Sequence, residues 1–158
     1  MRIPPLNISQ QLWSGLLAEL LQRGSCERES GAFLLGKPGT RRISIFICYD
    51  DLDPTALETG IITFHATGFV KLWAFCQSKG LKVFADIHTH PTDWTEQSES
   101  DRTNPMVAVP GHIAMILPDF AAPNSQPFNG ASFYEYRGNH KWKAHKLKSA
   151  PIKITDYE

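Results

Sequence analysis

The chain has 158 residues, of which 42% are hydrophobic and 20% are charged. This length and composition predict one globular domain over residues 1–158. Such a chain is long enough to bury a core without disulfides or metals to stabilise it. Its 16 lysines and arginines balance 16 aspartates and glutamates. Because no net charge draws the protein to nucleic acid or to an acidic membrane, neither is expected as a partner.

The cysteines and the first residues indicate the compartment. The three cysteines form no CxxC pair, which argues against a disulfide scaffold or a thiolate zinc site and for a reducing environment. The opening MRIPPLNISQ lacks the apolar core of a signal peptide, and no apolar run is long enough to span a bilayer. We therefore expect a cytoplasmic protein.

The first part of the chain predicts a helix and then strands. Leucines and a tryptophan recur every four residues over 7–24, which predicts an amphipathic helix capped by Asn7 and ended by Gly24. The apolar run SGAFLLGK predicts a buried strand, RRISIFICYDD a strand that is apolar on both faces, and GIITF (60–64) a third strand.

The second part predicts a further helix and a group of strands. TGFVKLWAFCQSKG predicts a helix that Thr67 caps and Gly80 closes, and LKVFADIHTH a strand. SESDRTN predicts a short helix, HIAMIL a strand, and residues 131–147 a hairpin that turns at Gly138-Asn139. This order predicts an α/β domain with a central mixed sheet flanked by helices.

Two histidines stand one residue apart in the stretch ADIHTHPTDWTEQSESDR. His88 and His90 lie at the C-terminal end of a predicted strand, so their side chains point to the same face. Imidazole is a common zinc ligand, and Asp101, across the following loop, supplies a carboxylate as third ligand. Three protein ligands leave the fourth tetrahedral position for a water, as in catalytic zinc sites. Zinc makes such a water a strong nucleophile near neutral pH.

Each part of this pattern has an ordinary structural alternative. Neighbouring histidines in a loop are commonly just solvated, and Ser98-x-x-Asp101 is also a capping box for a short helix. The combined spacing His-x-His-x7-Ser-x2-Asp arises by chance in roughly one such chain in a thousand, which favours the metal site. The two roles are compatible, because a capped helix start is a rigid place from which to direct Asp101. His112 is a competing ligand candidate outside this spacing.

Hydrolysis also requires a general base that takes the proton of the water and passes it to the leaving amine. Glu29 opens ESGAFLLG, at the start of a predicted buried strand. An isolated glutamate would be placed on the surface, but together with the metal motif Glu29 is the best candidate for this base.

These residues resemble the motif of the JAMM (MPN+, JAB1/MPN/Mov34) metalloprotease family: Glu29 before an apolar, glycine-ended strand, then His88-Thr-His90-Pro91, Ser98 and Asp101. The resemblance implies a single-domain JAB/MPN (cytidine-deaminase-like) fold with a mixed sheet. It implies His88, His90 and Asp101 as ligands of one Zn²⁺ with a bound water, and Glu29 as the acid/base. Ser98 would stabilise the tetrahedral intermediate or position the water.

The family hydrolyses isopeptide or peptide bonds after the C-terminal tail of ubiquitin or ubiquitin-like proteins. A compact stand-alone chain resembles the prokaryotic branch, whose members work beside bacterial E1- and E2-like enzymes, including antiphage conjugation systems. The resemblance implies a deconjugating or processing peptidase, with a ubiquitin-like tail as substrate and E1/E2-like enzymes as further partners. Gln97 departs from the family pattern, where a proline is frequent before the motif serine.

Some features of the substrate groove stay open at this point. We expect the loop 118–130 and the segment 91–97 to border the groove, with Trp94 either contacting substrate or filling the core. Two other functions are also open: a peptidase for a sulfur-carrier precursor or another peptide, and a non-catalytic interaction module with a structural zinc.

Overall fold

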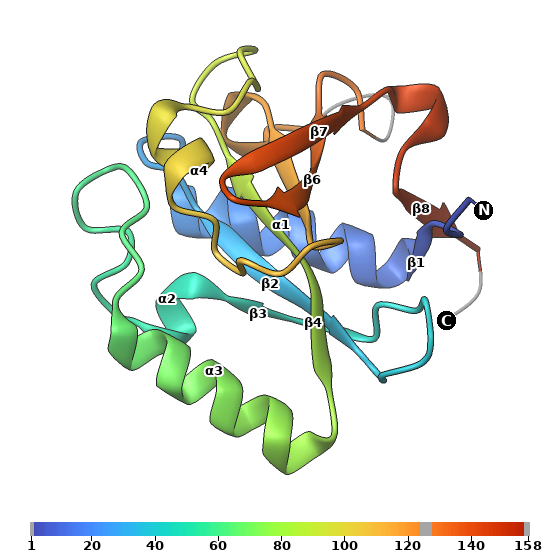
Figure 1. Ribbon diagram of the computed structural model, residues 1–158. Coiled ribbons are helices and arrows are strands. Elements are labelled where there is room, and N and C mark those ends of the chain that lie inside the picture. The colour runs from blue at the N-terminus through green and yellow to red at the C-terminus, as the bar shows by residue number, and fades with distance from the viewer. Residues whose placement is uncertain (1, 124–127, 157–158) are drawn as a thin grey trace.

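The structure of the protein, a computed structural model, describes residues 2–123 and 128–156. Six strands form a mixed sheet in the order β3-β2-β4-β5-β6-β7 (Figure 1). Only the central pair β4 and β5 is parallel, and every other neighbouring pair in this sheet is antiparallel. The strands are β2 (Gly31–Gly36), β3 (Ile45–Cys48), β4 (Lys82–Thr89), β5 (Ile113–Leu117), β6 (Ser132–Gly138) and β7 (Lys141–His145). The predicted α/β class with a mixed sheet is confirmed.

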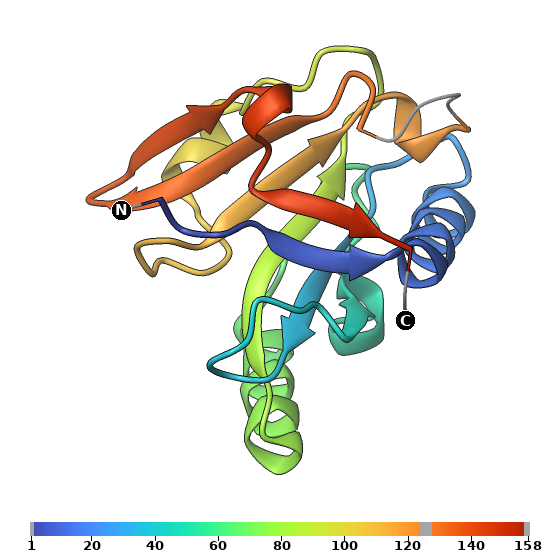
Figure 2. The same cartoon turned by 90° about the vertical axis from the view of Figure 1, so that its right-hand side faces the viewer.

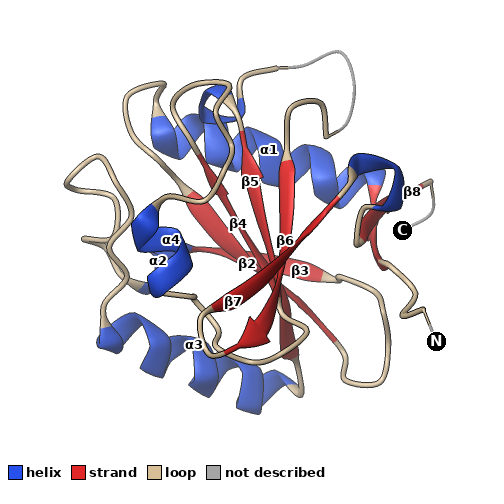
Figure 3. Ribbon diagram, turned by 45° about the horizontal axis from the view of Figure 1, so that its top comes forward, coloured by secondary structure: helices blue, strands red, loops and turns tan. Residues whose placement is uncertain are grey.

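Two long helices cover the two faces of this sheet (Figure 3). Helix α1 (Gln10–Gly24) packs Trp13, Leu16 and Leu20 against one face. Helix α3 (Ala66–Lys79) packs Leu72 and Cys76 against the other face. Each helix buries one apolar stripe, as the four-residue spacing of its apolar side chains predicts.

Four short elements complete the set of helices and 3-10 turns among the described residues. They are the helices α2 (Tyr49–Leu52) and α4 (Glu99–Thr103) and the 3-10 turns η1 (Asp119–Ala121) and η2 (Leu147–Ser149). Helix α4 is the short helix predicted from SESDRTN. Among the described residues, none of the helices combines the length and the apolar composition that crossing a bilayer requires.

A second, two-stranded sheet joins the two ends of the chain. Strands β1 (Leu6–Ser9) and β8 (Ile152–Thr155) run parallel and lie side by side (Figure 2). Leu6, Ile8 and Ile152 are buried and extend the core under α1. The sequence did not predict this sheet, because four-residue strands carry too little periodicity to be recognised.

The helix caps correct two predictions. Helix α1 begins after Ser9, whose hydroxyl accepts a hydrogen bond from the Leu12 amide at 3.1 Å, whereas Asn7 lies in β1. Helix α3 begins after His65, so Thr67 is not its cap. The predicted stop is confirmed, since Gly80 adopts a left-handed conformation (φ 65°) at the end of α3.

Residues 60–64 are wrongly predicted as a strand. Gly60 has a φ of 90° and Ile61 is 60% exposed, so the segment turns away from the sheet. Its backbone instead bonds to neighbouring loops: the Glu29 amide donates to the Gly60 carbonyl, and the Thr63 amide donates to the Ala56 carbonyl. Similarly, the strand predicted from RRISIFICYDD is confined to β3, since Tyr49 begins α2.

Candidate metal centre

Strand β4 brings the two predicted histidine ligands together. His88 lies in the strand, and His90 follows its last residue. Because side chains alternate along a strand, both imidazoles emerge on the face that α3 covers. Their Nε2 atoms lie 3.2 Å apart, and both side chains are buried.

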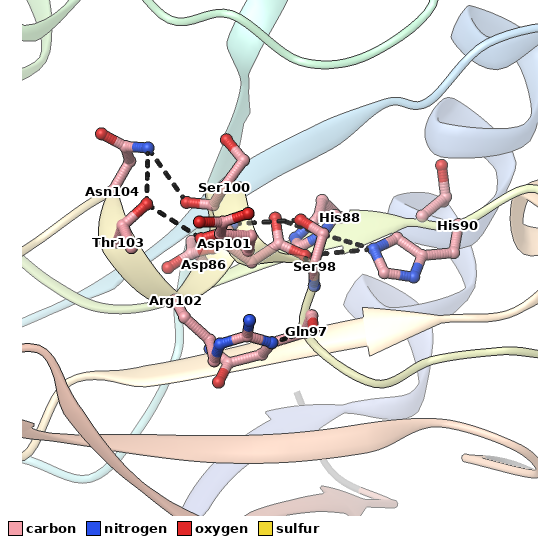
Figure 4. Close-up of polar contacts among 12 residues, drawn as sticks. Asp86, His88, His90, Gln97, Ser98, Ser100, Asp101, Arg102, Thr103 and Asn104 are labelled. Atoms are coloured by element: carbon pink, nitrogen blue, oxygen red, sulfur yellow. Dashed lines mark hydrogen bonds and ion pairs between the residues drawn. The ribbon is translucent and has the colours of Figure 1, made fainter.

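Helix α4 adds the carboxylate of Asp101. The Ser98 hydroxyl accepts from the Asp101 amide at 3.1 Å, and the Asp101 carboxylate accepts from the Ser98 amide at 2.9 Å. This is the predicted capping box, and it fixes Asp101 against the histidines. The carboxylate oxygens of Asp101 lie 3.4 Å from His88 Nε2 and 3.3 Å from His90 Nε2 (Figure 4).

The spacing of these three groups fits one tetrahedral metal ion. Ligands bound to zinc at ordinary bond lengths of about 2.0–2.1 Å are separated by about 3.3 Å when the geometry is tetrahedral. Two imidazole nitrogens and one carboxylate are a donor set typical of Zn²⁺. His88, His90 and Asp101 are thus brought together as predicted, in a group that could hold a metal ion.

The loop after β4 orients the imidazole of His90. Its Nδ1 donates to the Trp94 carbonyl oxygen at 3.0 Å, which leaves Nε2 free to bind a metal. The Trp94 ring also stacks on the His90 ring, with centroids 5.4 Å apart and planes inclined by 16°. Trp94 is 48% exposed and does not fill the core. It therefore stands at the rim of the site.

Hydrogen bonds hold the segment 91–97 and the adjoining His90 in place. The Thr95 hydroxyl donates to the Gly130 carbonyl oxygen at 2.8 Å and also lies 2.6 Å from the Ser132 hydroxyl. The Phe120 amide donates to the His90 carbonyl oxygen at 2.9 Å. The loop 118–130 thus reaches the segment beside the histidines, although its residues 124–127 lie outside the described residues.

Glu29 lies just before β2, where the sequence placed it. Hydrogen bonds on both sides fix its backbone: its own amide donates to Gly60, and the next amide, of Ser30, donates to the Thr89 hydroxyl at 3.0 Å. Thr89 stands between the two histidines in sequence. This clamp fixes the Glu29 backbone against the end of β4, and its half-buried carboxylate interacts electrostatically with His88 and His90.

The charges of the cluster shift the pKa values of its members. Burial is the main cause that raises the pKa of Glu29, and the imidazoles of His88 and His90 oppose the shift. Burial alone would also raise the pKa of Asp101, but hydrogen bonds from the two imidazoles hold it well below its usual range. Asp101 is therefore ready as an anionic ligand, while Glu29 is suited to exchange a proton.

The structure also contains a buried polar group that the sequence reasoning missed. His112 is not a ligand of the histidine cluster, because its Nε2 lies 2.6 Å from Asp86 Oδ1. The Tyr49 hydroxyl donates to Asp86 Oδ2 at 3.2 Å. The signal in the sequence was Asp86 itself, a charged residue within the apolar run VFADI of β4.

Comparison with known proteins bears on the fold. No model of a known protein family matches this chain. Among solved structures, a Desulfitobacterium hafniense protein is 13% identical with a TM-score of 0.63, covering 96% of this chain and 94% of its own. A Salinibacter ruber protein is 16% identical with a TM-score of 0.56, covering 90% of each chain. At these identities the two likenesses show a shared fold and nothing of activity.

A third solved structure, a JAB1/MPN domain protein from Archaeoglobus fulgidus, is 19% identical and covers 96% of this chain and 98% of its own. Its TM-score of 0.47 is too low to carry weight on its own.

Proposed function

We propose that the protein is a zinc-dependent peptidase that hydrolyses the bond after the C-terminal glycine of a ubiquitin-like protein, in deconjugation or precursor processing. The observation that carries the proposal is the convergence of His88, His90 and Asp101 at ligand spacing, with the half-buried Glu29 carboxylate in electrostatic interaction with the two histidines. The resemblance of this residue set to the JAMM motif supports the substrate class and a place beside bacterial E1- and E2-like enzymes.

The residues would divide the reaction as follows. His88, His90 and Asp101 would hold the ion, which supplies Lewis-acid polarisation of the scissile carbonyl and activates a water. Glu29, with its raised pKa, would take the proton of the attacking water and pass it to the leaving amine. Ser98 would hydrogen-bond the developing oxyanion or the water, in addition to capping α4.

The exposed ring of Trp94 is proposed as a wall of the substrate groove. It is rigidly placed, because its carbonyl accepts from His90 and its indole N–H donates to the Glu96 carboxylate at 3.2 Å. An extended tail that lies over the metal would pass this ring, and an exposed aromatic face offers it a large contact area at small entropic cost.

Cleavage of a defined fusion tests the proposal. The substrate is the ubiquitin-like protein encoded nearest this gene, carrying a C-terminal extension, and the enzymes are the wild type and Glu29→Gln. Glu27→Gln is the matched control, because Glu27 is exposed and only two residues away. We expect cleavage after the terminal glycine by the wild type and the control, abolished by Glu29→Gln and by a chelator.

Two outcomes would contradict the proposal. If the zinc-loaded wild type leaves the fusion intact, the substrate class is wrong, and a sulfur-carrier precursor or a binding role becomes the better hypothesis. If Glu29→Gln cleaves as fast as the wild type, Glu29 is not the base.

A further inference from the structure

Asp86 occupies a position where a charged side chain is unexpected. It lies in β4 at the centre of the sheet, is 3% exposed, and pairs with Phe33 on β2 and Ala114 on β5. A buried carboxylate costs free energy unless hydrogen bonds compensate for its lost hydration.

Two donors fix this carboxylate in place. His112 Nε2 lies 2.6 Å from Oδ1, and the Tyr49 hydroxyl lies 3.2 Å from Oδ2. Because a carboxylate only accepts, both partners donate and His112 carries a hydrogen on Nε2. All three side chains are buried, so the group forms a closed network inside the protein.

Stability alone is a weak explanation for this network. Buried ion pairs can be replaced by apolar residues of similar volume with little loss of stability, and often with a gain. The network is also incompletely satisfied, since among the described residues the buried Nδ1 of His112 has no hydrogen-bond partner. A costly polar group of this kind, within an otherwise apolar core, is typical of a functional role.

The position of Asp86 relative to the metal ligands indicates that role. Asp86 and His88 lie two residues apart on the same face of β4, which separates their backbones by about 7 Å. The Tyr49 ring also packs against Gly31, the residue that pairs with His88: a Cβ at Gly31 would lie 2.2 Å from that ring. The network therefore forms the layer directly behind His88.

We propose that Asp86 is a positioning residue of the metal centre, whose fixed, buried charge raises the affinity of the His88–His90–Asp101 cluster for a divalent cation without coordinating it. The inference rests on the metal site of the proposed function. A buried charge in the layer next to a dication, screened by protein and not by water, contributes strongly to binding. His112 and Tyr49 hold the carboxylate in place, so that it does not rotate away.

Titration of Zn²⁺ into metal-stripped protein tests the inference without any substrate. We expect Asp86→Asn to weaken zinc binding about tenfold or more, the size seen when groups behind metal ligands are altered. Glu135→Gln is the matched control, because it also breaks a carboxylate–imidazole pair, 3.0 Å to His145, but in β6. We expect the zinc affinity of Glu135→Gln to stay within about twofold of the wild-type value. That change is small beside the roughly tenfold loss expected for Asp86→Asn.

A second variant keeps the test decisive if Asp86→Asn folds poorly. Asp86→Leu with His112→Leu removes the whole pair and fills its space with apolar groups, so the metal-free protein should remain folded. Its zinc affinity should fall by the same factor. Melting of each metal-free variant is recorded separately, because a purely structural role would change that melting temperature and leave the affinity unchanged.

The outcomes separate this inference from the proposed function. Wild-type zinc affinity in the Asp86 variants, beside normal binding by the wild type, would overturn the role of Asp86 alone. A wild type that binds no divalent ion would overturn the metal centre and this inference together.

Discussion

The two faces of the six-stranded sheet are built from the same strands but filled with different chemistry. On the α1 side, β4 contributes Ala85 and Ile87 to a core of apolar side chains. On the α3 side, the alternate residues Asp86 and His88 are buried and polar. The first face maximises apolar burial, whereas the second carries costly groups that a fold alone does not need. The difference separates the residues that stabilise the protein from those proposed to serve its chemistry.

The largest difference in zinc affinity is expected between substitutions of two adjacent β4 residues that point to opposite faces of the sheet. His88→Ala removes a metal ligand, so zinc affinity should fall at least hundredfold and hydrolysis should be lost. Ile87→Val, one residue earlier, should cost about 0.5–1.5 kcal/mol of unfolding free energy and leave the metal affinity unchanged. Zinc titration and urea unfolding of both variants measure the two quantities. Equal zinc affinities in the two variants would contradict the assignment of the metal ligands to the α3 face.

The α1 face should show the opposite response. Leu16 is fully buried in the core under α1, and Leu16→Ala should lower the unfolding free energy by about 2–5 kcal/mol. Zinc affinity of the folded protein should stay at the wild-type value, because α1 covers the face away from the ligands. A large loss of affinity in this variant would mean that the two faces are coupled.

Acid should begin to weaken metal binding at a higher pH than it would for a histidine with an ordinary pKa. Burial alone would lower the pKa of His88, but Asp101, with smaller help from Asp86, raises it above 6.5. Only the neutral imidazole binds a metal, so a proton competes with the ion below this raised pKa, at a cost of about tenfold in affinity per pH unit. Zinc titrations between pH 5 and 8 measure the effect. An affinity that is constant down to pH 6 would contradict it.

The smallest expected effect is a difference in turnover between variants of the two helix-capping serines. Ser9 and Ser98 each accept a hydrogen bond at 3.1 Å from the amide three residues on. Replacing either serine with alanine should cost about 1 kcal/mol of stability. Only Ser98→Ala should also lower peptidase turnover, since α4 carries Asp101 and α1 carries no ligand. If both variants retain full turnover, Ser98 is a cap and nothing more.

The grouping of His88, His90 and Asp101 could be predicted from sequence because their spacing encodes their geometry. Alternation along β4 puts His88 and His90 on one face, and the capping box at Ser98 fixes the helix that carries Asp101. Glu29 was placed by its position before an apolar strand. These local rules need no knowledge of distant contacts.

Features that depend on distant contacts could not be predicted. The partners of Asp86, Tyr49 and His112, lie 37 and 26 residues away in sequence, and no spacing rule joins them. Strand β1 pairs with β8 from the other end of the described chain. Residues 60–64 have an apolar composition suited to a strand, but their backbone hydrogen bonds go to Glu29 and Ala56 in neighbouring loops.

The most direct test of the account is a count of zinc ions per chain in reconstituted wild type and Asp101→Asn. The side-chain oxygen of an asparagine can still accept from the Ser98 amide, but asparagine is a poor zinc ligand, so the variant should remain folded. The account predicts one zinc per wild-type chain and none in the variant. Equal zinc content in both proteins, or none in either, would contradict it.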